Sequence, residues 1–281
     1  MKILLTGAKG QLGQALQRTL TAHAVTAYDH AQLDITKLTN VRDAIYAMYP
    51  DVVINAAAYN NVDGAESDPL SSYRGNALGP RNLAVATATA GIPLLHVSSD
   101  YVFDGASTRP YHEFDRPHPL SAYAASKLAG EDAVRELNPK HYLVRTAWLY
   151  SAVGKNFAKT ICALAQQQSE VRVVKDQIGS PTYVPHLATA IATLISTQAF
   201  GTYHFANQGA ASWYDLTCAL YRQRGITTPV QAVTTPEFPR SAKRPAYSAL
   251  MTIQDPTILL PTWEEGVVAF AKAISEGKGT V

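Results

Sequence analysis

Cysteine is scarce in this sequence. Only Cys162 and Cys218 occur among 281 residues, far apart and each in an apolar, helix-like segment. Two such residues make no disulfide framework, and we interpret them as core packing. The eight histidines show no HExxH or comparable spacing, so the sequence predicts no metal site.

Long apolar runs and a surplus of one charge are also missing. No stretch approaches 18 uninterrupted apolar residues, and the first apolar run, in MKILLTG, ends after three. We therefore expect a cytoplasmic protein with neither a membrane span nor a signal peptide. The formal net charge is only +2, and Lys and Arg do not cluster with aromatic residues, so nucleic acid is not an expected partner.

What the first half does have is a regular alternation of two patterns. Apolar runs typical of buried strands lie at 2–6, 24–28, 51–55, 93–98 and 142–146. Helical periodicity lies between them, at 11–21, 38–49, 70–90 and 122–137. This alternation predicts an α/β fold with a doubly wound parallel sheet, the Rossmann arrangement.

The alternation loosens after residue 147. Helical patterns at 156–168, 185–197 and 263–275, a strand at 171–174 and a proline-rich stretch at 228–245 follow. We predict a dinucleotide-binding domain over 1–147 and a smaller, mainly substrate-binding C-terminal lobe over 148–281. The segments near 171–200 and 201–206 are expected to return to the first domain.

A glycine-rich turn, TGAKGQLG, joins the first predicted strand to the first predicted helix. Gly7, Gly10 and Gly13 would permit a tight turn, close approach of the backbone to a diphosphate, and close helix packing. Gln11 and Leu12 lie at the start of that helix, whose N-terminus attracts anions. An isolated pattern of this kind is often an ordinary turn, but the flanking strand and helix favour dinucleotide binding.

The second predicted strand ends at Asp29, where a carboxylate would accept hydrogen bonds from a ribose 2′-hydroxyl. This favours NADH, although Lys9 or His30 would offset repulsion of a 2′-phosphate, so the expected cofactor is NADPH or NADH. Asp29 alternatively caps the turn. In LDIT, Asp34 is either an adenine-side contact or a helix cap.

Other residues are expected along the cofactor because they are small or lie at strand ends. They are Ile35, Ala56, Ala57, Ala58, Tyr59 and Ser98.

The segment HVSSDY places Ser99 at the carboxyl edge of the fourth strand, where open α/β sheets bind ligands. In the helix that follows, Tyr123 and Lys127 are four positions apart and share one face. A lysine beside a phenol favours the phenolate and lowers the phenol pKa. We predict hydride transfer at a carbonyl: Ser99 binds the oxygen, Tyr123 donates the proton, and Lys127 lowers the Tyr123 pKa and binds the nicotinamide ribose.

TGAKGQLG and YAASK resemble the TGxxGxxG and YxxxK patterns of the extended short-chain dehydrogenase/reductase family. Within that family the chain is similar to dTDP-4-dehydrorhamnose reductases. The segments that carry this similarity are NAAAYNNVDGAE, GNALGPRNLA, SSDYVFDG, VRTAWLY, DQIGSPTY and SWYDL.

The resemblance implies reduction of the 4-keto group of dTDP-4-dehydro-L-rhamnose to dTDP-L-rhamnose by NAD(P)H, with Ser99, Tyr123 and Lys127 as catalytic residues. It implies that Asn76 contacts the cofactor. The substrate contacts that it implies are Tyr101, Trp148, Asn156, Gln177 and Arg244. From the residues alone, core packing for Trp148, a helix cap for Asn156, a tight turn around Gln177 and a surface charge for Arg244 remain open.

The chain departs from the family pattern at Asn60, where Thr is common, and at Gly75, where a β-branched residue is usual. Asn60 leaves the identity of the sugar open, so a 4-epimerase or a reductase of another deoxysugar nucleotide stays an alternative. A second alternative is a non-catalytic dinucleotide-binding subunit of the methionine adenosyltransferase type. Some family members form homodimers around Mg²⁺; a homodimer is thus an expectation, without metal ligands that we can assign.

Overall fold

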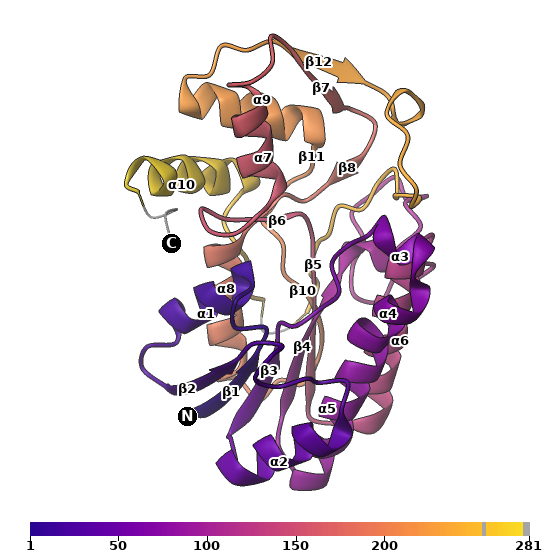
Figure 1. Ribbon diagram of the computed structural model, residues 1–281, viewed down its shortest axis with the longest axis vertical. Coiled ribbons are helices and arrows are strands. Elements are labelled where there is room, and N and C mark those ends of the chain that lie inside the picture. Colours follow the sequence, from indigo (N-terminus) through magenta and orange to yellow (C-terminus); the bar gives the residue numbers. More distant parts are fainter. Residues whose placement is uncertain (255–256, 278–281) are drawn as a thin grey trace.

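Six parallel strands form the central sheet of the computed structural model, which describes residues 1–254 and 257–277 (Figure 1). Their order across the sheet is β10, β5, β4, β3, β1, β2. Their bounds are Lys2–Thr6 (β1), Ala24–Tyr28 (β2), Val52–Asn55 (β3), Leu94–Ser99 (β4), His141–Thr146 (β5) and Gly201–His204 (β10). The order turns back between β1 and β3, and open α/β sheets bind ligands at such a switch point.

Helices cover both faces of this sheet (Figure 1). One face carries α1 (Gln11–Thr19) and α8 (Val184–Leu194). The other face carries α2 (Leu38–Met48), α5 (Gly79–Ala90) and α6 (Ala122–Leu137). All four residues of β3 are buried, as expected for a strand covered on both sides. The doubly wound parallel sheet is therefore confirmed.

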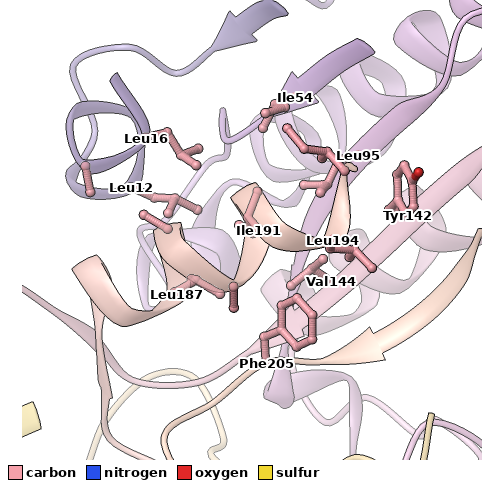
Figure 2. Packing of buried hydrophobic residues seen from close by; sticks show 14 of the residues in the cluster. Leu12, Leu16, Ile54, Leu95, Tyr142, Val144, Leu187, Ile191, Leu194 and Phe205 are labelled. Carbon is pink, nitrogen blue, oxygen red and sulfur yellow. The ribbon is translucent and has the colours of Figure 1, made fainter. Parts of the chain in front are cut away.

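Figure 2 shows how α1 and α8 meet over the sheet. Leu12 and Leu16 of α1 lie against Leu187 and Ile191 of α8, and Ile54 of β3 and Leu95 of β4 belong to the same cluster. Along the chain, α8 comes after segments that belong to the C-terminal lobe. The chain therefore returns from the lobe to the central sheet to complete this core.

The smaller lobe lies beyond the carboxyl ends of the strands (Figure 1). It contains α7 (Phe157–Leu164), α9 (Trp213–Arg224), α10 (Trp263–Ser275), and the paired strands β7 (Val171–Val174) and β12 (Val230–Val233). These elements share an apolar core of their own.

Several shorter elements connect the two parts. Two-residue strands pair as β6 (Leu149–Tyr150) with β9 (Thr182–Tyr183) and as β8 (Ile178–Gly179) with β11 (Ala211–Ser212). The remaining short helices are α3 (Gly64–Ser67), η2 (Asp100–Val102) and η3 (Thr235–Glu237). In the described part of the chain, no helix has both the length and the apolar character to cross a membrane.

The five strands predicted for the first half are all present, each within one residue at either end. Only part of the segment expected to return to the first domain does so. β10 pairs with β5, and α8 packs against α1, but β7 pairs with β12 inside the lobe. The expectation that all of 171–200 joins the first domain is therefore corrected for β7, whose residues alternate between buried and less buried, as in a strand covered on one face.

The single helix predicted over 70–90 is interrupted. It consists of α4 (Pro69–Tyr73), a π-helical turn (Arg74–Leu78) and α5. The π-helical turn contacts α6 closely at Gly130, where an added Cβ would lie 2.0 Å from the carbonyl oxygen of Asn76. Only glycine permits this approach, which brings α6 against the segment that lines the cofactor side of the fold.

Replacement of this glycine tests the packing. Helix propensity alone predicts that Gly130→Ala stabilises the protein by up to about 1 kcal/mol. We expect instead a loss of about 1–3 kcal/mol in the free energy of unfolding, because the methyl group displaces a backbone carbonyl. Urea denaturation measures it, with the exposed Glu136→Ala in the same helix as the control, expected to change by less than about 0.5 kcal/mol. A stabilised Gly130→Ala variant would contradict the packing.

Candidate active site

Two adjoining cavities lie at the carboxyl edge of the sheet. One, of about 660 Å³, is bordered by the glycine-rich turn and the end of β2, and the other, of about 370 Å³, by the end of β4 and the start of α6. Gly10, Ala56, Ala58 and Asn60 line both, so the cavities adjoin. We name them the turn cavity and the strand cavity.

The glycine turn brings three backbone segments into contact. Gly7 has φ of +78°, and an added Cβ would meet the backbone of Ala56 at 2.6 Å. At Gly13 an added Cβ would lie 2.1 Å from the carbonyl oxygen of Gly7. The first turn of α1 contains no acidic residue, and its N-cap, Gly10, has no side chain to bond the free amides. These amides and the helix dipole can hold a diphosphate, so the turn fits a dinucleotide.

The far end of the turn cavity has a charged pair. Asp29, directly after β2, forms an ion pair with Lys9 of the glycine turn, and it also accepts a hydrogen bond from the amide of Gln32 at 3.0 Å. These bonds hold the pKa of Asp29 below its usual value, with the Lys9 bond the largest cause. The carboxylate of Asp29 therefore caps the turn and also lines the cavity, and its contact with a ribose 2′-hydroxyl stays a prediction.

Two residues predicted to touch the cofactor lie behind the cavity walls. Asp34 accepts bonds from the amide and hydroxyl of Thr36 at 3.0 and 2.7 Å in a local turn, and it is not the helix cap of its alternative, because the N-cap of α2 is Lys37. Asn76, 1% exposed, accepts a bond from the Tyr59 amide at 2.9 Å and donates to the Tyr59 carbonyl and to Ser126. Neither borders a cavity, and the amide of Asn76 is bonded to the backbone of Tyr59, so a direct contact of Asn76 with the cofactor stays a prediction.

Other predicted cofactor residues border the two cavities. The turn cavity is lined by Gly7, Gly10, Asp29, Ile35, Ala56, Ala57, Ala58 and Tyr59, and the strand cavity by Gln11, Leu12, Ser98, Tyr123 and Lys127.

Ser99, Tyr123 and Lys127 all line the strand cavity. Tyr123 is buried and hydrogen-bonds Ser99. Burial raises the pKa of Tyr123 to about 12, only partly offset by the bond to Ser99. The net shift is upward because loss of solvent around the phenol is the largest effect, and a lowering of the Tyr123 pKa by Lys127 stays a prediction. A phenol with this pKa carries its proton at neutral pH, as a proton donor must.

Lys127 extends beneath the cavity. It is 2% exposed, and its ammonium donates to the carbonyl oxygen of Val97 at 2.7 Å. Burial lowers the pKa of Lys127 to about 8, against an upward effect from Glu131 one helical turn later. The lysine is thus held in place by the end of β4 and remains mostly protonated at neutral pH.

An indole pair forms one wall of the strand cavity. Trp148 and Trp213 stack with ring centroids 3.5 Å apart and planes within 3° of parallel. Trp148 has φ of +48°, a conformation uncommon for residues other than glycine and enriched at functional sites. Sequence analysis predicted Trp148 but missed Trp213, whose signal is the capping box Ser212–Asp215 that places it in the first turn of α9.

Gln11 connects the glycine turn to the lobe. Its side-chain oxygen accepts hydrogen bonds from Ser151 and from Asn156, each at 2.9 Å. Asn156 is also the N-cap of α7, accepting a bond from the Lys159 amide at 3.0 Å. It does not line either cavity, so the structure gives Asn156 the role of a cap that joins the two parts of the chain.

Of the remaining predicted substrate residues, only Tyr101 lines the strand cavity. Gln177 is buried and donates to Thr235 at 3.0 Å, which fits its turn alternative. Arg244 makes a two-bond ion pair with Asp63 at 2.8 and 2.9 Å and bonds Tyr101, so it is no free surface charge. The pairing lowers the Asp63 pKa to about 2.

Sequence analysis gave no role to Asp100 and did not name Lys155, although both border the strand cavity. Asp100 lies in the SSDY motif noted in the sequence, whereas no local sequence pattern singles out Lys155. Among the described residues, no three His, Cys, Asp or Glu side chains are grouped to hold a metal ion.

Comparison with known proteins identifies the family. Residues 1–276 match the family model described as RmlD substrate binding domain. The chain belongs to this RmlD family. The sequence is 40% identical over 264 residues to a dTDP-4-dehydrorhamnose reductase from Aggregatibacter actinomycetemcomitans, covering 89% of this chain and 90% of that protein.

Solved structures of RmlD relatives have the same fold. A dTDP-4-dehydrorhamnose reductase from Clostridium acetobutylicum has a TM-score of 0.96 and 41% identity, covering 98% of this chain and 100% of that one. The enzyme of that name from Bacillus anthracis, in complex with NADP, has a TM-score of 0.94 and 40% identity, covering 96% and 98%. The resemblance to this family seen in the sequence is confirmed.

Proposed function

We propose that this protein is an NAD(P)H-dependent oxidoreductase that reduces the 4-keto group of dTDP-4-dehydro-L-rhamnose to give dTDP-L-rhamnose. The observation that carries the proposal is the meeting of Ser99, Tyr123 and Lys127 in one cavity that the glycine turn also borders. Relatives at about 40% identity bear the name of this activity, and one of them binds NADP.

Each group of site residues has a separate role in this reaction. A dinucleotide held by the glycine turn and the first amides of α1 supplies a hydride to the carbonyl carbon. Tyr123, protonated at neutral pH, donates its proton to the carbonyl oxygen, and Ser99 provides a second hydrogen bond to that oxygen. Lys127 presents a buried positive charge that stabilises the phenolate left on Tyr123. Trp148 and Trp213 offer a flat apolar wall for the sugar nucleotide.

The wider setting of the reaction is also part of the proposal. We place the enzyme in the cytoplasm, in the synthesis of a rhamnose-containing polysaccharide, with the dTDP-sugar as its partner. The homodimer expected from the resemblance and the division of the chain at residue 147 stay predictions.

A sugar-nucleotide 4-epimerase would use the same three side chains. It differs in regenerating its coenzyme at each turnover, so net oxidation of NADPH with the keto sugar distinguishes the reductase. The regulatory-subunit alternative predicts no turnover at all.

The role of Tyr123 is tested by Tyr123→Phe, which removes the proton and keeps the ring. Loss of a general acid lowers kcat by about 10²–10⁴-fold. Binding of NADPH, followed by fluorescence titration, should stay within about threefold, because the hydroxyl does not hold the diphosphate. The exposed Tyr46→Phe is the matched control and should keep full activity. Turnover retained in Tyr123→Phe would remove Tyr123 from the mechanism.

The ion pair between Lys9 and Asp29 predicts the coenzyme response. Lys9 neutralises a carboxylate that would otherwise repel a 2′-phosphate, so Lys9→Ala should lower kcat/KM with NADPH by about tenfold, equivalent to about 1.4 kcal/mol. The same constant with NADH should change little. Lys37→Ala is the control, because Lys37 approaches Asp34 at 3.8 Å outside the cavity. An equal loss with both coenzymes would contradict this role of Lys9.

A further inference from the structure

Asp100 is a buried carboxyl group that the reaction described above does not use. It is 2% exposed, follows Ser99 at the end of β4, and borders the strand cavity. Its two oxygens have separate partners: the hydroxyl of Ser99 lies 3.1 Å from Oδ1, and the hydroxyl of Ser248 lies 2.6 Å from Oδ2. Ser248 comes from the C-terminal segment, so the carboxyl group joins two distant parts of the chain at the reacting side chains.

The hydrogen bonds around Ser99 can be counted. A serine hydroxyl has one hydrogen to donate and two lone pairs to accept with. Ser99 Oγ accepts from the Tyr101 amide at 3.2 Å. When Asp100 is ionised it can only accept, so the single hydrogen of Ser99 is held by Oδ1. Ser99 then has no hydrogen for a substrate carbonyl.

When Asp100 is neutral, the hydrogen bond between Asp100 and Ser99 runs in the opposite direction. Its carboxyl proton on Oδ1 can be donated to Ser99 Oγ, while Ser248 continues to donate to Oδ2. Ser99 then accepts from Asp100 and from the Tyr101 amide, and its own hydrogen becomes free to point into the cavity.

We propose that Asp100 is a positioning residue whose neutral form turns the Ser99 hydroxyl toward the substrate carbonyl. The inference rests on the proposed reduction. Asp100 does not itself touch the reacting carbon or donate the transferred proton.

The surroundings of Asp100 permit this switch near neutral pH. Burial raises the Asp100 pKa to about 7, and the bonds from Ser248 and Ser99 act in the opposite direction. The titratable groups around it are Tyr101 in its own turn, Tyr123 and Lys127 on α6, and Arg244, which bonds Tyr101. Burial raises the pKa of both tyrosines, so these stay neutral, and Lys127 titrates at about 8.

The sign of the pH effect follows from the raised pKa. Below about pH 7 Asp100 is neutral and the arrangement is competent; above it the anion withdraws the Ser99 hydrogen. We expect kcat to fall as pH rises through about 7, before any further fall caused by loss of the Lys127 charge near 8.

The test is the pH profile of kcat, from pH 5.5 to 9, for wild type, Asp100→Asn and Ser248→Ala. An asparagine side chain keeps one acceptor and one donor, as the neutral acid does, but cannot ionise. Asp100→Asn should therefore keep at least about a third of the low-pH kcat and lose the decline near pH 7. Ser248→Ala removes a bond that favours the anion, so its decline should move to higher pH. The exposed Asp132→Asn on α6 should leave the profile unchanged.

A decline near pH 7 that persists in Asp100→Asn would overturn the proposal, as would a profile that Ser248→Ala does not move. An independent readout needs neither coenzyme nor substrate. Carboxyl ¹³C NMR of wild type labelled at aspartate should show one group titrating near pH 7 that is missing from Asp100→Asn, and its absence from wild type would also overturn the proposal. If wild type does not oxidise NADPH with the keto sugar, the proposed function fails instead.

Discussion

The site depends on one constraint, the close approach of the strand ends at the switch point between β1 and β3. Gly7 and the backbone of Ala56 are so near that a Cβ on Gly7 would overlap the chain. Thr6 donates to Asn55 at 2.7 Å, and Asn55 contacts His96 at 2.9 Å, so buried side-chain bonds tie the ends of β1 and β3 to the middle of β4. Because these strands are held together, the glycine turn and the polar end of β4 border the same cavity.

A second buried network supports the catalytic helix. Glu131, one turn after Lys127 on α6, accepts hydrogen bonds from Arg145 of β5, the shortest at 2.7 Å, and both residues are at most 2% exposed. Arg145 also lies over the ring of Phe103 and near His204 of β10. A buried ion pair stabilises the fold only when the other hydrogen-bonding groups of its two side chains also have partners. Here the neighbouring strands supply those partners. The pair thereby fixes α6, with Tyr123 and Lys127, against the sheet.

The parts predicted well from sequence are those encoded locally. Each strand of the first half is a short apolar run between turn residues, and the glycine turn and the Tyr123–Lys127 spacing need only a few neighbouring residues to be recognised.

Prediction from sequence was less successful where the partners of a residue are far apart in sequence. Asn76 holds Tyr59 and Ser126 instead of lining a cavity, and Asn156 bonds Gln11, 145 positions away. The raised pKa of Tyr123 likewise depends on burial by distant segments, which residue spacing does not reveal. Roles for Trp213 and Asp100 can be assigned only from the structure, in which α9 places Trp213 at the strand cavity and Ser248 bonds Asp100 there.

Reduction by this protein requires net transfer of a hydride from the coenzyme to the C4 carbonyl carbon of the sugar nucleotide. The most direct measurement is NMR of the product formed from dTDP-4-dehydro-L-rhamnose and NADPH deuterated at nicotinamide C4 on the transferred face. The account predicts one deuterium at C4 of dTDP-L-rhamnose, with one NADPH oxidised for each product molecule. A product without deuterium at C4, or conversion of the sugar without net oxidation of NADPH, would contradict it.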